Sequence, residues 1–283
     1  MSEARSPTQP ARWEVVNSTS GAMYFDCSRA CVPVTTIGSP IDVFIDGVAE
    51  TLKLGQPGDL ASSDALGRLL ILGLVTSAEG YFRDVLLGLT SVCPLAQEKI
   101  ADQLIALGAL EFYGAHDAAR GVFEGVSFAS ETEVRKRTEQ ISGATWKKTD
   151  SLGVALSNFE KVCHMRHAAV HTKGVLNRGN AKALGLALAG GRQMHLSVDV
   201  PHLHQAARAC TNVVRDYNTV VYRHTLRRWL DQKVLSGTWA KDKRRFTAAF
   251  DLFRCKTDSV APPSAYAAYL SYLPSLTQRL SGP

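Results

Sequence analysis

Two long stretches of helical periodicity limit the fold more than any other feature of this sequence. Apolar or small residues recur at steps of three and four over positions 66–89, and again over positions 203–224. A capping serine precedes the first stretch, and Asp199 with Pro201 opens the second. Because each helix must bury one face, the pattern predicts an all-α protein built as an antiparallel helical bundle.

The segments outside these helices suggest a division of the chain. Val32 to Ile37 and Asp42 to Ile45 are β-branched runs separated by Gly-Ser-Pro, so we expect a small extended or β-like cap there. The sequence predicts a tail and cap over 1–57, the helical bundle over 58–232, and a helical appendage of the same domain over 233–283. This C-terminal appendage combines basic and aromatic residues.

The charge of the chain is concentrated in one segment. The net charge is +6, whereas positions 223–256 alone hold ten Lys/Arg against three Asp/Glu, a local excess of +7. Such a segment is suited to a polyanion such as RNA, although a solvated basic helix has the same composition. The two interpretations remain open at this point.

The six cysteines and the N-terminal sequence bear on location. The cysteines are scattered without a Cys-x-x-Cys pair, which is typical of reduced thiols. The first sixteen residues lack the apolar centre of a signal peptide, and the longest apolar run, 69–78, is too short to span a bilayer. We therefore expect a cytoplasmic protein without a membrane partner.

Residues 162–174 carry the densest chemistry. They place one arginine and three histidines within eight residues, on a third helix that Asp150 or Ser151 can cap and that Gly174 is placed to end. His171 then lies in the last turn, where the helix carbonyls favour a protonated ring, while the nearby Arg166 disfavours it. These opposing effects favour an imidazole that exchanges protons near neutral pH.

Arg166 and His171 together are sufficient for one reaction without a metal. A histidine moves a proton, an arginine stabilises charge on a phosphate, and the 2′-hydroxyl of RNA supplies the nucleophile. The five-residue spacing separates the two side chains by about 140° around a helix. They can act on one phosphate only near the helix end, or when a second copy supplies facing groups.

The run Arg166-His167-Ala168-Ala169-Val170-His171 matches a known pattern: Arg, then Asn, His or Asp, three variable residues, then His. It resembles the signature of HEPN-domain proteins, which are dimerising helical bundles and often metal-independent endoribonucleases of toxin–antitoxin and anti-phage systems. The similarity covers roughly positions 60–232. It implies an HEPN-like bundle that acts on RNA without a cofactor, a homodimer with a composite active site, and restraint by an antitoxin or sensor protein.

The resemblance also assigns roles. It implies that Arg166 and His171 carry cleavage, that His167 orients the arginine, and that Glu79 on the first long helix assists. Glu79 is equally compatible with an exposed helix position. One branch of the family has a regulatory tyrosine two residues after the histidine, and Lys173 stands there in this chain.

Other interpretations of the same residues stay open. His164, His167 and His171 follow one another at metal-ligand steps, which allows a metal hydrolase, although no acidic cluster stands nearby. The residues could also be packing and capping groups, in which case Arg166 needs a partner. A non-catalytic HEPN module that binds a nucleotide or RNA would have the same sequence.

Several cations are candidates for contacts with RNA phosphates. They flank the 162–174 segment or lie in the basic segment: Lys173, Arg178, Arg227, Arg228, Arg244 and Arg245. Trp229, Trp239 or Phe246 could stack on a base, or form the core of the appendage.

Overall fold

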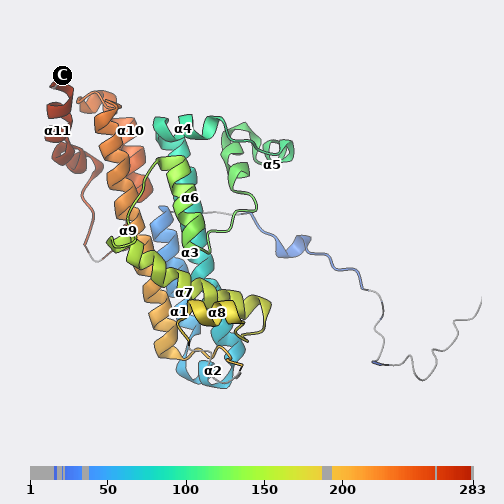
Figure 1. Ribbon diagram of the computed structural model, residues 1–283. Coiled ribbons are helices and arrows are strands. Elements are labelled where there is room, and N and C mark those ends of the chain that lie inside the picture. The colour runs from blue at the N-terminus through green and yellow to red at the C-terminus, as the bar shows by residue number, and fades with distance from the viewer. Residues whose placement is uncertain are drawn as a thin grey trace, which may run out of the picture. The chain divides into compact units, whose positions relative to one another are not determined.

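The computed structural model describes residues 16–17, 21, 23–33, 38–186, 193–258 and 260–281 (Figure 1). Within these residues the protein is helical and contains no β-strand, as the periodicity predicts. Contacts divide the chain into two units, 1–36 and 37–283. In the first unit the described residues are exposed, and their only helical element is the short 3-10 turn Ser28–Ala30.

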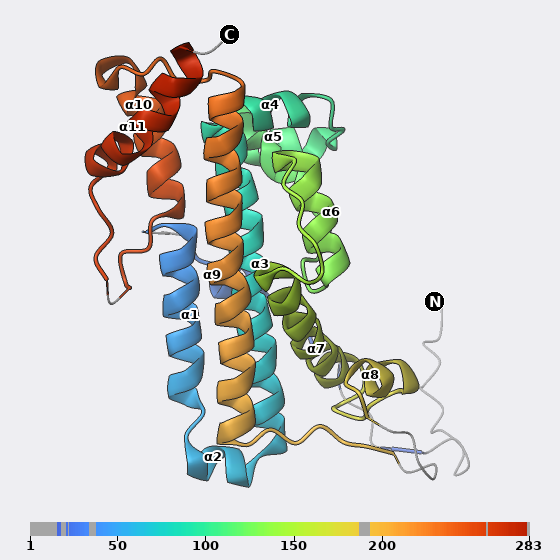
Figure 2. The same ribbon diagram turned by 60° about the vertical axis from the view of Figure 1, so that its left-hand side comes forward.

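The second unit is organised around two long helices, α3 (Asp64–Val92) and α9 (Val200–Asp231), which run side by side (Figure 2). Their starting points agree with the capping residues in the sequence, because Ser63 and Asp199 each accept a bond from the first turn. Where the two helices meet, Tyr81 and Phe82 of α3 pack edge-on against Tyr217 of α9.

The prediction of an extended cap at 42–45 is wrong. These residues belong to α1 (Pro40–Leu54), which packs along α3 and α9. The Gly-Ser-Pro run is a helix start, because Ser39 caps the helix and Pro40 occupies its first position. Ile41, Phe44 and Val48 lie at helical steps and are buried, so the helical period outweighs the β-branched composition. The other half of the predicted cap, 34–37, lies outside the described residues.

Shorter helices cover the end of α3. After α2 (Pro57–Ser62) and α3 come α4 (Pro94–Ala101), α5 (Leu107–Asp117), a 3-10 turn over Ala118–Phe123, and α6 (Glu131–Ser142). α6 packs on both α3 and α4, and its Thr138 hydroxyl lies 2.7 Å from the Tyr217 hydroxyl.

The third long helix, α7 (Ser151–His171), packs against both α3 and α9. Phe159 of α7 meets Phe82 of α3 edge-on inside the core. The short helix α8 (Arg178–Ala183) follows and packs back onto α7. The only pairing of extended backbone among the described residues is an isolated antiparallel bridge between Val175 and His195.

The C-terminal helices α10 (Trp239–Phe253) and α11 (Ala265–Ser281) pack on each other at the far end of α3 and α9 (Figure 2). A buried carboxylate joins this end to the start of α1. Asp42 Oδ1 accepts the backbone N–H groups of Lys256 at 2.7 Å and Thr257 at 3.2 Å.

α3 is the one described helix that is long and apolar enough to cross a membrane by length and composition. In this structure it is the central helix, with α1, α7, α9 and α10 packed on it. A core helix of this kind passes the same test, so the criterion does not distinguish the two roles.

Candidate functional site

The segment at 162–174 forms the end of α7, as predicted. The helix ends at His171, and the N–H groups of Thr172 and Gly174 both bond to the Ala168 carbonyl, at 3.2 and 2.9 Å. Gly174 has φ +92, a conformation that favours glycine. A Cβ on Gly174 would lie only 2.7 Å from Cδ of Arg68, so the close packing on α3 also requires glycine.

Arg166 lies one to two turns before this end and is half-buried. Its Nε is buried without a hydrogen-bond partner, and in the described part of the chain the guanidinium makes no ion pair. A buried guanidinium nitrogen without an acceptor is costly, so Nε of Arg166 remains available to an acceptor from outside the described chain.

Two carboxylates lie near Arg166 without pairing with it. Burial, then neighbouring Cys210, Glu160 and Glu79, raise the pKa of the Cys163 thiol far above its usual value, while Arg166 lowers it. The guanidinium and both carboxylates are therefore close enough to the buried Cys163 thiol to affect its pKa.

Glu79 has a structural partner that the sequence did not indicate. Its Oε1 accepts the Ser127 hydroxyl and the Phe128 N–H, both at 2.8 Å. It thus holds the loop before α6, and it is neither a fully exposed helix residue nor paired with Arg166.

His167 and His171 lie on successive turns, are exposed, and have ring centroids 4.6 Å apart. Partial burial, followed by the nearby His171, His164 and Arg166, lowers the pKa of His167. The lowered pKa favours the neutral form of His167, which places less positive charge beside His171 than a protonated His167 ring would.

A residue outside the 162–174 segment holds two of its histidines. Asn180 of α8 is buried, and its Oδ1 lies 3.1 Å from Nδ1 of His164. Its Nδ2 lies 3.2 Å from Nδ1 of His167. No spacing in the sequence indicates this contact, because it depends on the turn that folds α8 back onto α7.

The histidines are not arranged as a metal site. Among the described residues, no group of three or more His, Cys, Asp or Glu side chains is placed to hold a metal ion. The Nδ1 atoms of His164 and His167 are both engaged by Asn180. This geometry weighs against the metal-hydrolase interpretation.

The predicted phosphate contacts fall into two groups. Lys173 and Arg178 are exposed beside the end of α7. The other four lie at the opposite end of the long helices: Arg227, Arg228, Arg244 and Arg245. Two of these are engaged: Nη1 of Arg228 donates to the Ser142 carbonyl at 2.5 Å, and Nη1 of Arg245 donates to the Val234 carbonyl at 3.2 Å.

The separation between the groups can be followed along α3. The end of α7 contacts Arg68, whereas Leu252 of α10 contacts Gly88, which is twenty residues further along the helix, since 88 minus 68 is 20. That corresponds to about 30 Å. The stacking role considered for Trp229 and Phe246 is wrong, because both rings are buried in the core.

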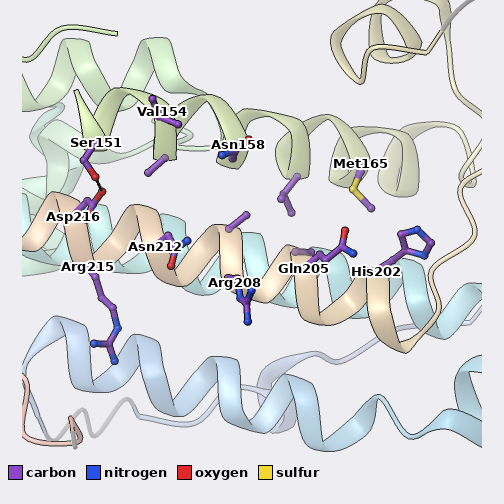
Figure 3. A pocket seen from close by; sticks show the side chains of 14 residues that line it. Ser151, Val154, Asn158, Met165, His202, Gln205, Arg208, Asn212, Arg215 and Asp216 are labelled. Carbon is purple, nitrogen blue, oxygen red and sulfur yellow. Dashed lines mark hydrogen bonds between the residues drawn. The ribbon is translucent and has the colours of Figure 1, made fainter. Parts of the chain in front are cut away.

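A groove of about 770 Å³ between α7 and α9 was not predicted (Figure 3). Met165 and His202 lie at one end, and Ser151, which donates to Asp216 at 2.5 Å, lies at the other. Its wall on α7 runs from Ser151 to Met165, fourteen residue steps or about 21 Å. The groove is lined by Met165 but not by Arg166, His167 or His171.

Comparison with known proteins adds no further constraint: no family model, no curated protein and no solved structure matches this chain.

Proposed function

We propose that this protein is a metal-independent endoribonuclease of the HEPN type, acting as a toxin or anti-phage effector. The observation that carries the proposal is Arg166, whose half-buried guanidinium has an unpaired Nε, five residues before the exposed His171 on the same helix. An arginine without an acceptor next to an exposed imidazole is suited to a phosphate diester. The family resemblance of residues 166–171 supplies the class of reaction.

In the proposed reaction, the 2′-oxygen of the substrate attacks phosphorus while the bond to the 5′-oxygen breaks. The products are a 2′,3′-cyclic phosphate and a free 5′-hydroxyl. His171 accepts the proton of the 2′-hydroxyl, and His171 of a second copy protonates the leaving oxygen. Arg166 stabilises the negative charge that develops on the phosphate oxygens. This arrangement makes the active site composite and the functional unit a homodimer.

The loop contacts of Glu79 support a different role for that residue. Both bonds to its Oε1 hold the segment before α6. We therefore propose that Glu79 maintains the wall behind Arg166, and that Arg166 and His171 carry the chemistry.

The test is cleavage of end-labelled single-stranded RNA in EDTA, with the matching DNA oligonucleotide as a substrate that lacks the nucleophile. Arg166→Ala and His171→Ala are each expected to lower the rate by about 100-fold or more. His116→Ala, which removes an exposed histidine of α5, is the matched control. The product end should be a cyclic phosphate.

Cleavage that continues unchanged in both variants would overturn the proposal. Loss of cleavage in EDTA would support a metal hydrolase instead. RNA binding that depends on Arg166 without any cleavage would favour the non-catalytic HEPN module. An antitoxin or sensor would then be sought as a protein that suppresses the measured activity.

A further inference from the structure

Asn180 is placed by its own short helix to face α7. Asn177 caps α8, and its Oδ1 accepts the Asn180 N–H at 2.8 Å. The Asn180 side chain is then only 4% exposed and has the two histidine rings as its partners. A buried amide needs both its acceptor and its donor satisfied, and these two rings do so.

The amide constrains the protons of the two rings differently. In the orientation that the amide has in this structure, its oxygen accepts from an Nδ1–H group of His164 and its NH₂ group donates to an unprotonated Nδ1 of His167. The neutral His167 ring therefore carries its hydrogen on Nε2. On the other side of the His164 ring, Oε1 of Glu160 lies 3.9 Å from Nε2.

We propose that Asn180 is a positioning residue that holds His167 as the neutral, Nε2–H imidazole, so that His167 presents a donor and His171 alone exchanges protons. The assignment of roles in catalysis rests on the proposed ribonuclease function. The assignment of the tautomer does not.

The groups around His167 act in the same direction. His164, Arg166 and His171 of α7 are the titratable or charged groups that lower the pKa of His167, and partial burial has the largest effect. Protonating Nδ1 of His167 would set two donors against each other unless the amide turned over. Turning it over would face its NH₂ group towards the Nδ1–H of His164. Asn180 therefore couples the two rings.

The experiment measures the ring nitrogens of His167 by NMR with ¹⁵N-labelled protein. In the parent protein, Nε2 should carry the hydrogen at neutral pH. Asn180→Asp has nearly the same shape but accepts from both rings, so it should move a hydrogen to Nδ1 of His167 and raise its pKa. Asn180→Leu removes both bonds and should leave a mixture of tautomers.

Asn177→Ala is the matched control, because it removes the α8 cap and keeps the Asn180 amide group. If Asn180 had only a structural role, substitutions at Asn180 and at Asn177 would have the same effect on the His167 tautomer and on the pH profile. Cleavage by Asn180→Asp at neutral pH should fall about fivefold, the factor that corresponds to one ordinary hydrogen bond. The remaining activity should fall further as the pH rises above the new pKa of His167, because the neutral ring then keeps its hydrogen on Nδ1, facing the introduced carboxylate, and loses the Nε2–H donor. A structural defect would not show this dependence.

The outcomes separate the two proposals. An unchanged His167 tautomer in Asn180→Asp overturns the positioning role, whatever the activity. A changed tautomer with no cleavage by any variant, the parent included, supports the tautomer assignment and refutes the ribonuclease function. A pH profile equal to that of Asn177→Ala overturns the catalytic consequence.

Discussion

The two ends of the long helices combine the same residue types in opposite ways. At the end of α7, the histidines are exposed and the arginine is half-buried without a partner. At the α10–α11 end, the rings of Phe246, Phe250 and Tyr269 are buried, and Lys241, Lys243, Arg244 and Arg245 are exposed. Composition left open whether this basic end contacts RNA or is only solvated, and the proposed catalytic groups lie at the other end.

For locating a binding site, the cost of a buried charge is more informative than the local net charge. The +7 segment owes its composition to exposed side chains around an aromatic core. Nε of Arg166 is buried without a partner, as is Nε of Arg254 at the C-terminal end, but Arg254 also pairs with Asp251, whereas Arg166 makes no ion pair among the described residues. A fold tolerates such a group where a ligand supplies the missing acceptor.

The largest expected difference between the ends concerns chemistry. Arg166→Lys keeps the charge but loses the planar fork, and we expect a fall in cleavage rate of about 100-fold. The double charge reversal of Arg244 and Arg245 should leave the rate at saturating RNA within about twofold, because α10 is about 30 Å from the site along α3. Single-turnover rates check both. A larger loss in the α10 variant would reverse the comparison.

For stability, in contrast to cleavage, a substitution at the α10–α11 end should have the larger effect. Asp242 of α10 is buried and accepts bonds from the Ser236 N–H and hydroxyl, the Gly237 N–H and the Tyr269 hydroxyl. Asp242→Ala leaves these donors unpaired and should lower the free energy of unfolding by about 3 kcal/mol. Denaturant titration measures this value, with the exposed Asp251→Ala as control.

The same carboxylate gives a pH dependence. Burial would raise the pKa of Asp242, but bonds from Ser236, Tyr269 and Gly237 outweigh it and lower the pKa. Because the pKa is lower in the folded state, the stabilisation is present above the unfolded value of about 3.9 and is lost as the pH falls through the folded value. In Asp242→Ala, the acid-induced loss of stability should be smaller. An identical acid profile would contradict the assignment.

Gly174→Ala tests the close packing at the end of α7. The positive φ and the 2.7 Å approach to Arg68 should cost about 1–2 kcal/mol of stability. Gly185→Ala is a useful control, since its φ is +73 but nothing lies within 4 Å of its Cβ position. If the two variants lose equal stability, the backbone conformation alone explains the effect and the packing on Arg68 adds nothing.

The smallest effect should be on RNA affinity at the α10 end. Reversal of Arg244 and Arg245 should weaken binding at low salt, with a salt slope smaller by about 0.7 for each lost phosphate contact. Fluorescence anisotropy at several salt concentrations measures it. Unchanged affinity at low salt would remove this end from the RNA surface altogether.

The long helices could be predicted because their period and caps are local. α3, α7 and α9 begin and end within a few residues of the positions that Ser63, Gly174 and Asp199 indicate. α1 was missed because β-branched residues next to Gly-Ser-Pro are also typical of a strand and a turn. Its burial against α3 is a tertiary effect that outweighs such propensities.

The site was less predictable than the fold. Arg166, His167 and His171 share one helix, so their spacing is visible in the sequence. The contacts of Asn180 and Glu79 join different elements, and no local pattern encodes them. The unpaired state of Arg166 depends on what surrounds it, which only the packed structure gives.

The bond network of Asp42 has a consequence for how the chain unfolds. It joins the first turn of α1 to backbone groups 214 and 215 positions later. Unfolding at either end of the chain therefore separates the buried Asp42 carboxylate from its donors. The α10–α11 end is thus expected to melt together with α1, α3 and α9 in one cooperative transition. A chain shortened after Asp231 should be markedly less stable, and it should not behave as a bundle freed of an independent module.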